Sequence, residues 1–150
     1  MEIDATDRKI LNMLLEGNNP RYKDIAKQLG ITIGTVHNRI KAMEANGIIS
    51  KIVPVVNSKS LGYDVVALIN ISIKGGHLEK IEQKFARHKN VCSVYDVTGD
   101  FDSLIIAKFK DTSELNAFVK KLLAEEYVTR TNTSLILNIV KESVSPGMIE

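Results

Sequence analysis

One stretch, residues 22–49, restricts what this chain can fold into more than any other part of the sequence. Apolar residues at i, i+3, i+4 and i+7 predict a first short helix: Tyr22, Ile25, Ala26 and Leu29. Gly30 is suited to end that helix in a left-handed conformation, and Thr32 to cap the next one. The second helix has its own apolar stripe, formed by Val36, Ile40 and Met43. This spacing is typical of a helix-turn-helix, although an ordinary helical hairpin has similar features.

The second helix carries small, hydrogen-bonding or cationic side chains away from its apolar stripe. No carboxylate appears on it before Glu44, so this surface suits the negatively charged groove of DNA. We expect Asn38 and Lys41 to reach base edges or nearby phosphates, and the neighbouring polar residues to contact the backbone. The alternative is that they are merely solvated. The candidate DNA-binding residues are Thr32, Gly34, Thr35, His37, Asn38, Arg39 and Lys41.

The segments around this motif predict a winged helix-turn-helix domain over residues 1–52. Asp4 is a candidate N-cap for a supporting helix that carries Ile10 and Leu11 on its apolar side. After the second motif helix, residues 48–53 are rich in β-branched side chains, which favours a strand or wing. Residues 53–63 contain a proline, a glycine and short polar residues, so we interpret them as a strand followed by a linker.

Residues 64–150 predict a second, α+β domain. Strand patterns over 64–74, 91–98, 103–109 and 129–140 alternate with helical spacing at 78–85 and 111–122. The order β-α-β-β-α-β is that of the ferredoxin-like fold, with both helices on one face of an antiparallel sheet. In the last strand, Leu135, Leu137 and Ile139 should share a face. Because the other sheet face also carries apolar residues, we expect a partner to cover it.

The sequence contains no constellation that indicates an enzyme. The three histidines lie in separate segments without a second ligand at i+3 or i+4, so neither a metal nor a cofactor is predicted. Cys92 is a single cysteine in an apolar run, which favours a buried, inert thiol. No run is long enough to span a membrane, and we expect a cytoplasmic protein. The net charge of +2 is concentrated in residues 1–62, which carry nine Lys or Arg against six Asp or Glu.

Taken together, these motifs resemble the Lrp/AsnC, or feast/famine, regulators over nearly the whole chain. The resemblance rests on residues 3–11, 25–30, 35–41 with Glu44, 47–49, and 99–102. It implies a winged helix-turn-helix joined to a ferredoxin-like (RAM/ACT-like) domain that binds an effector and mediates oligomerisation. Two positions depart from the usual pattern: Thr32 replaces a serine and still caps, and Arg21 replaces a capping serine.

The family resemblance also implies how such a protein works. Its partners would be double-stranded DNA, a free small amino acid as effector, and copies of itself, as homodimers that assemble further to octamers. An Asp carboxylate in the 98–102 turn would pair with the ammonium group of the amino acid, and a neighbouring subunit would supply hydroxyls. The implied effector residues are Thr98, Gly99, Asp100, Phe101, Asp102, Thr133 and Ser134. The resulting function is an amino-acid-responsive, sequence-specific transcriptional regulator. The alternatives are an effector-independent architectural DNA-binding protein and, less favoured, a small enzyme.

Overall fold

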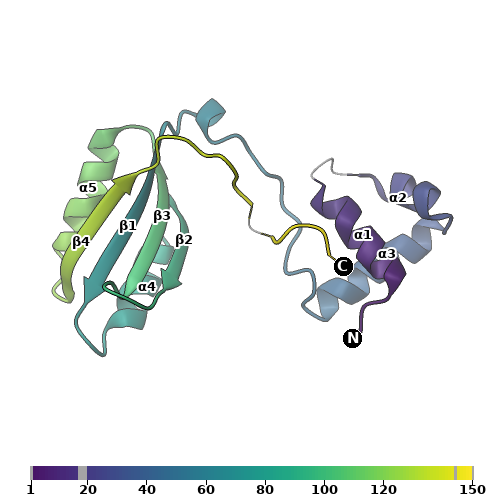
Figure 1. Cartoon of the computed structure of the whole chain (residues 1–150), viewed down its shortest axis with the longest axis horizontal. Helices are drawn as coiled ribbons and strands as arrows, with labels where there is room; N and C mark the ends of the chain where they lie inside the picture. Colours follow the sequence, from purple (N-terminus) through teal and green to yellow (C-terminus); the bar gives the residue numbers. More distant parts are fainter. Residues whose placement is uncertain (1, 17–19, 144, 150) are drawn as a thin grey trace. The chain divides into compact units, whose positions relative to one another are not determined.

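The computed structural model describes residues 2–16, 20–143 and 145–149, which form two compact units. One unit comprises Met1–Val55 with Lys141–Glu150, and the other comprises Val56–Val140. The sequence-based division placed all of residues 64–150 in the second domain, so the grouping of the C-terminal segment with the first unit was not anticipated. Figure 1 shows the helices and strands of both units.

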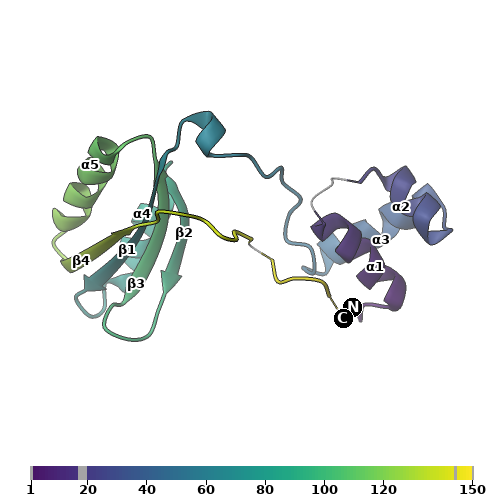
Figure 2. The same cartoon turned by 45° about the horizontal axis from the view of Figure 1, so that its top comes forward.

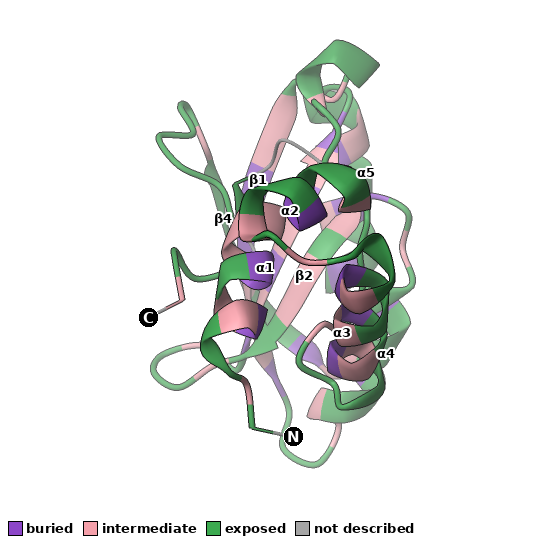
Figure 3. Cartoon of the chain, turned by 90° about the vertical axis from the view of Figure 1, so that its right-hand side faces the viewer, coloured by how far each residue is buried: buried purple, intermediate pink, exposed green. Residues whose placement is uncertain are grey.

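The first unit is built from three helices: α1 (Ala5–Leu15), α2 (Tyr22–Leu29) and α3 (Ile33–Ala45). Gly30 ends α2 with φ +67°, the left-handed conformation that a sharp turn into α3 requires. Each of the helices carries buried residues along one side, as the burial colours of Figure 3 show. The buried core consists of Ile10, Leu11, Ile25, Ala26, Val36, Ile40 and Met43. This core includes the apolar stripes predicted for the helix-turn-helix.

The C-terminal segment packs on this three-helix core through Ile149. The side-chain amide of Asn12 donates to the Ile149 carbonyl oxygen at 3.1 Å, and its oxygen accepts the Ile149 N–H at 2.7 Å. The Ile149 side chain also packs against the core of the helices. These contacts are the physical reason that residues after Val140 group with the first unit.

The predicted wing strand over residues 48–53 does not form within this chain. Residues 50–57 are extended but unpaired, and Val55 is 98% exposed. β-branched residues favour a strand only where a neighbouring strand can accept their hydrogen bonds, and the described part of the first unit contains no strand. A short 3-10 helix, η1 (Lys59–Leu61), follows before the second unit's sheet.

The second unit is an α+β sandwich with the predicted element order. Its elements are β1 (Val65–Ile73), α4 (Leu78–Ala86), β2 (Val91–Asp96), β3 (Ser103–Phe109), α5 (Thr112–Leu123) and β4 (Val128–Leu135). The four strands are antiparallel in the order β2-β3-β1-β4, as the ferredoxin-like fold requires. Both helices cover the same sheet face (Figures 1 and 2), and their buried side chains, such as Phe85 and Phe118, pack on Ile69 and Ile105.

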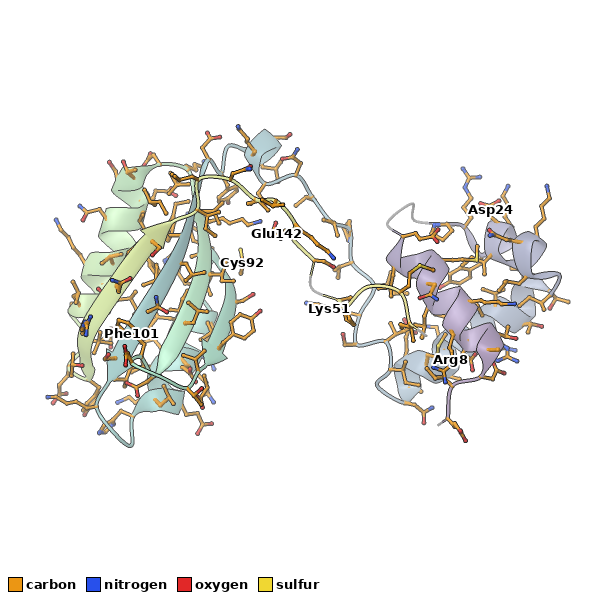
Figure 4. All side chains as sticks on the ribbon, viewed as in Figure 1. Arg8, Asp24, Lys51, Cys92, Phe101 and Glu142 are labelled. Atoms are coloured by element: carbon orange, nitrogen blue, oxygen red, sulfur yellow. The ribbon has the colours of Figure 1, made fainter. Side chains whose placement is uncertain are left out.

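Two predictions for the strands of this unit are wrong: the end of the last strand and the burial of Cys92. The last strand ends at Leu135 rather than Val140: Ile136 still donates its N–H to the Val66 carbonyl oxygen, and the pairing with β1 stops there. Leu137 therefore lies beyond the sheet and is 96% exposed. Cys92 is exposed, not buried, because the pairing of β2 with β3 shifts register between Val91 and Ser93. Figure 4 labels this thiol on β2.

The open face of the sheet has an apolar centre with polar margins. Because Ala67, Ile69 and Ile71 point into the core, the alternate residues of β1 face away from the helices. The register places β3 residues of the same alternation beside them. The apolar residues of this open face are Val66, Leu68, Leu104 and Ile106, with Tyr95 on β2, and polar ones are Asn70, Ser72, Asn132 and Ser134.

Candidate DNA-binding surface and effector site

The exposed side of α3 carries most of the residues predicted to contact DNA. Val36, Ile40 and Met43 are fully buried against α1 and α2, so the opposite side of the helix is free. Gly34, His37, Asn38 and Lys41 are exposed on that side. The His37 ring lies beside that of Tyr22 on α2, with the ring centroids 6.2 Å apart. The structure thus gathers these four positions on one accessible helix surface.

Thr32 and Thr35 fix the first turn of α3. The Thr32 hydroxyl oxygen accepts the Thr35 backbone N–H at 3.0 Å, the N-cap bond predicted from the sequence. The two side-chain oxygens also lie 2.8 Å apart, within hydrogen-bond distance. Capping therefore occupies part of the hydrogen-bonding capacity of both threonines, and their remaining lone pairs and protons are directed to the surface.

Arg39 has a structural contact that was not expected from the sequence. Its Nη1 atom donates to the Asp4 carboxylate at 2.7 Å and to the Asp7 carboxylate at 2.8 Å. Asp7 is only 2% exposed and also forms a capping box with Asp4 at the start of α1. These contacts hold α3 against α1, and because the Arg39 side chain is still 31% exposed, its contact with the DNA backbone stays a prediction.

The charges around Arg39 shift the ionisation of their neighbours in a consistent direction. The Asp7 backbone N–H, followed by the Arg39 guanidinium, holds the pKa of the Asp4 carboxyl below its usual value of 3.8. The hydrogen bond to Asp7, then that to Asp4, raises the pKa of Arg39 above its usual value. Asp4 and Arg39 therefore stay charged at neutral pH, and their ion pair persists.

Lys41 forms an exposed ion pair that DNA can replace. Its Nζ lies 2.9 Å from the Glu44 carboxylate one turn along α3, and this hydrogen bond raises the pKa of Lys41. Exposed pairs of this kind contribute little to stability because water solvates both partners well. The lysine therefore stays protonated and can exchange Glu44 for a phosphate at small free-energy cost.

Two features of the DNA-binding surface were missed in the sequence. Lys23 and Lys27 are exposed on α2, where a positioning helix can contact phosphates. Ile33, the first residue of α3, is 54% exposed although it is apolar. The sequence alone did not reveal this exposure, because Ile33, three residues before Val36 and seven before Ile40, continues the apolar stripe of α3 into its first turn.

The predicted effector loop, residues 98–102, joins β2 to β3 and is fixed by Asp102. The Asp102 carboxylate accepts the Ile73 backbone N–H at 2.7 Å, and its own N–H donates to the Ile71 carbonyl at 3.0 Å. Its carbonyl oxygen accepts the Val97 N–H at 3.1 Å. Gly99 has φ +121°, which favours glycine at this bend. Asp102 therefore ties the loop to the end of β1, and Asp100 is exposed.

The Phe101 ring contacts the guanidinium group of Arg130, a residue that was not predicted to belong to the site. The Arg130 guanidinium, at the start of β4, lies 4.9 Å from the centroid of the Phe101 ring. Figure 4 labels Phe101 in the loop that precedes β3. Within the described parts of the chain, no carboxylate forms an ion pair with Arg130. Its charge is therefore free to attract an anion beside the loop.

Thr133 and Ser134 are not brought to this loop within a single chain. Thr133 is paired with Ile69 and Ser134 with Leu68, so the two side chains point to opposite faces of the sheet. Both lie three or more residues beyond Arg130, roughly 10 Å or more along β4 at 3.3 Å per residue. Their predicted contribution to a neighbouring subunit's site remains a prediction.

Other site types find no support in the described residues. No group of three or more His, Cys, Asp or Glu side chains among them is arranged to hold a metal ion. None of the helices in this part of the chain is long and apolar enough to cross a membrane.

Comparisons with known proteins match both units of the chain. Residues 3–50 match the family model of the winged helix-turn-helix DNA-binding domain, and residues 66–146 match that of the Lrp/AsnC ligand binding domain. An HTH-type transcriptional regulator of Pyrococcus horikoshii is 45% identical over 142 residues, which cover 95% of this chain and 96% of the relative. The HTH-type transcriptional regulator FL11 of Pyrococcus furiosus is 33% identical over 94% of this chain and 93% of its own length.

Solved structures have the same fold. E. coli AsnC is similar with a TM-score of 0.85 and 27% identity, over 97% of this chain and 99% of that one. A transcriptional regulator of Neisseria meningitidis, solved as a complex with L-Met, has a TM-score of 0.86 and 24% identity over 97% and 96% of the two chains. These matches agree with the helix-turn-helix and the α+β fold described above, and the chain belongs to the Lrp/AsnC family of DNA-binding transcriptional regulators.

Proposed function

We propose that this regulator is sequence-specific and responds to a free amino acid bound beside the loop of residues 98–102. The observation that carries the proposal is the juxtaposition of an exposed carboxylate, a left-handed glycine and an unpaired guanidinium: Asp100, Gly99 and Arg130. The match to a ligand-binding domain supports it. So does the N. meningitidis relative, whose structure contains L-Met.

The chemistry of an amino acid fits these groups at both of its charged ends. An ammonium group requires carboxylate or carbonyl acceptors, which Asp100 and the free oxygen of Asp102 offer. A carboxylate is bound best by an arginine fork or by exposed backbone amides. Arg130, stacked on Phe101, and the amides around Gly99 can supply these donors. The effector is therefore expected to lie across the loop, with its side chain directed to surfaces outside this group.

The effector prediction is tested by substituting Asp102 in two ways. Asp102→Asn keeps an oxygen for the Ile73 N–H but removes the charge, whereas Asp102→Ala removes both. A thermal-shift screen with the amino acids first identifies the effector, since a ligand of the folded form raises the unfolding midpoint. Calorimetry should then find effector affinity reduced roughly tenfold or more in Asp102→Asn and in Asp100→Asn, because a charged hydrogen bond contributes about 1.5 to 3 kcal/mol.

Asp102→Ala separates the two roles of this carboxylate. We expect it to lose effector binding and also to lower the midpoint of the second unit, because the Ile73 N–H loses its acceptor. Equal effector affinity in the wild type, Asp100→Asn and Asp102→Asn would show that the loop is only a turn.

The alternative is an architectural DNA-binding protein without an effector. It would bind DNA equally well in the presence and absence of every amino acid. A screen in which no amino acid changes the midpoint, the DNA affinity or the state of assembly would favour that function over the regulated one.

The DNA prediction is that α3 enters the major groove with Asn38 and Lys41 facing the duplex. Asn38→Ala should weaken binding by ~1 to 3 kcal/mol on the cognate site only, because a base-reading side chain discriminates between sequences. Lys41→Ala should weaken binding to all sequences and reduce the salt slope by about one. Fluorescence anisotropy at several salt concentrations measures both effects. Unchanged affinities in both variants, with normal unfolding midpoints, would contradict this placement of α3.

We further propose that the protein acts in the cytoplasm as a homodimer that assembles further, to an octamer. The open sheet face supports the dimer, because its apolar centre is covered by neither α4 nor α5. The linked DNA-binding units of one assembly would then bind several DNA sites at once with increased avidity. Sedimentation velocity over the nanomolar to micromolar range measures these steps of assembly.

A further inference from the structure

Ile33 is an exposed apolar side chain in a position where neither the core nor the helix needs it. It is 54% exposed, whereas the apolar stripe of α3, Val36, Ile40 and Met43, is completely buried. It does not cap the helix, since the hydroxyl of Thr32 already accepts the Thr35 N–H. Isoleucine also has a lower helix propensity than polar residues such as lysine and glutamine, which would suit an exposed position. The exposed part of its side chain is therefore available for a contact outside the chain.

Gly34, the next residue, gives a second and independent indication. It adopts no left-handed conformation, and a Cβ atom built on it would meet only the Thr32 side-chain oxygen, at 3.8 Å. Packing within the unit thus does not require a glycine there, although glycine lowers the stability of a helix. A missing side chain at this point is useful where another molecule's surface approaches the backbone closely.

Both residues belong to the first turn of α3, the part of a recognition helix that approaches base edges. Ile33 lies one turn before His37 and is exposed at the N-terminal end of the helix. In the major groove, the only apolar group that a base pair presents is the C5-methyl of thymine. A branched hydrocarbon side chain offers no hydrogen bond to any other base and packs well against that methyl group.

We propose that Ile33 is a specificity-determining residue that recognises thymine through its C5-methyl group, and that Gly34 lets the helix backbone approach closely enough for this contact. Ile33 recognises the base through an apolar contact that excludes water, whereas Asn38 recognises a base through hydrogen bonds. The proposal requires that α3 is the recognition helix, but it does not depend on an effector.

The experiment uses operator sites selected from random DNA with the full-length protein. Each thymine of the selected site is replaced in turn by deoxyuridine, which removes only the methyl group. For wild-type protein, one thymine per half-site should be sensitive, with affinity falling about three- to tenfold, as expected for one methyl group removed from an apolar contact. For Ile33→Ala, binding to the thymine site should fall by a similar factor and the uracil substitution should have no further effect.

The double-mutant comparison isolates the contact. Leu15→Ala, which truncates an exposed apolar residue on α1, is the matched control and should keep full sensitivity to uracil. Ile33→Gln should change the selected base from thymine to adenine, because glutamine hydrogen bonds to the adenine edge. Equal sensitivity to uracil in the wild type and in Ile33→Ala would overturn the proposal, as would a selected site without thymine facing α3. If Lys41→Ala still weakens binding in that case, the DNA-binding placement of α3 stands without it.

Discussion

Replacing Arg39 by methionine is expected to lower the free energy of unfolding of the three-helix unit by roughly 3 kcal/mol. The substitution keeps much of the aliphatic packing but leaves the Asp7 carboxylate, only 2% exposed, without its cation at 2.8 Å. Removing one partner of a buried pair costs far more than the pair contributes, since the remaining charge stays desolvated. Urea unfolding followed by far-UV circular dichroism measures the loss, with the two units treated as separate transitions.

Lys41→Met is the matched control for this experiment. It also removes one cation from α3 and breaks one ion pair, at 2.9 Å, but that pair is exposed and water replaces it. The unfolding midpoint should therefore barely change, whereas the affinity for DNA should fall. The opposite pattern, in which Arg39→Met is stable but does not bind DNA, would show that Arg39 acts mainly in DNA binding, as its sequence position indicated.

The pH dependence of stability provides a second measurement on the same cluster. The pKa of Asp4 is lowered in the folded protein, so its contribution is fully present above the unfolded value near 3.8 and is lost as the pH falls through the lower, folded value. The midpoint of the three-helix unit should therefore fall as the pH decreases below about 4. Arg39→Met should weaken this dependence without abolishing it, because the largest cause of the shift is the Asp7 backbone N–H.

Arg39 also illustrates why part of the site could not be predicted. The helix-turn-helix followed from short-range chemistry: apolar spacing, the glycine at 30 and the threonine cap at 32 act within a few residues. The partners of Arg39, by contrast, lie 32 and 35 residues away on α1. An arginine between asparagine and isoleucine on a helix has the same local pattern whether it contacts a phosphate or a carboxylate, so only the packing of α1 on α3 distinguishes the two roles.

The second unit follows the same division between local and long-range information. Alternation predicted four strands and two helices in the correct order, but alternation continues past the point where a partner strand ends. Pairing of β4 with β1 stops after Leu135, and residues 48–53 remain unpaired because their unit contains no described strand. Register also decides which side each residue faces: Thr133 lies opposite the buried Ile69, and Ser134 lies opposite Leu68 on the open face. Arg130 was not predicted to belong to the effector site, because its stacking on Phe101 joins residues far apart in sequence.

The second large effect is expected from Ile106→Glu, which should convert the proposed dimer into monomers. Ile106 lies at the centre of the open sheet face, opposite Leu68 of β1 and away from the helices. Its neighbour Ile105 points into the core and is fully buried, so the substitution at 106 leaves that core unchanged. A carboxylate buried between two apolar sheet faces would be desolvated without a partner, which should raise the dimer dissociation constant by at least roughly 100-fold.

Sedimentation equilibrium at micromolar concentration measures the dissociation, and circular dichroism checks that the variant remains folded. Ala86→Glu is the matched control, because it adds the same charge at an exposed position on α4, the helical side of the same sheet. It should leave the dimer intact. Leu137, which alternation placed on one face with Leu135 and Ile139 without deciding which face, is not an informative position, since it lies beyond β4 and is not part of the sheet face. A folded Ile106→Glu variant that still dimerises with wild-type affinity would show that the open face is not the interface, and would require another surface to link the DNA-binding units.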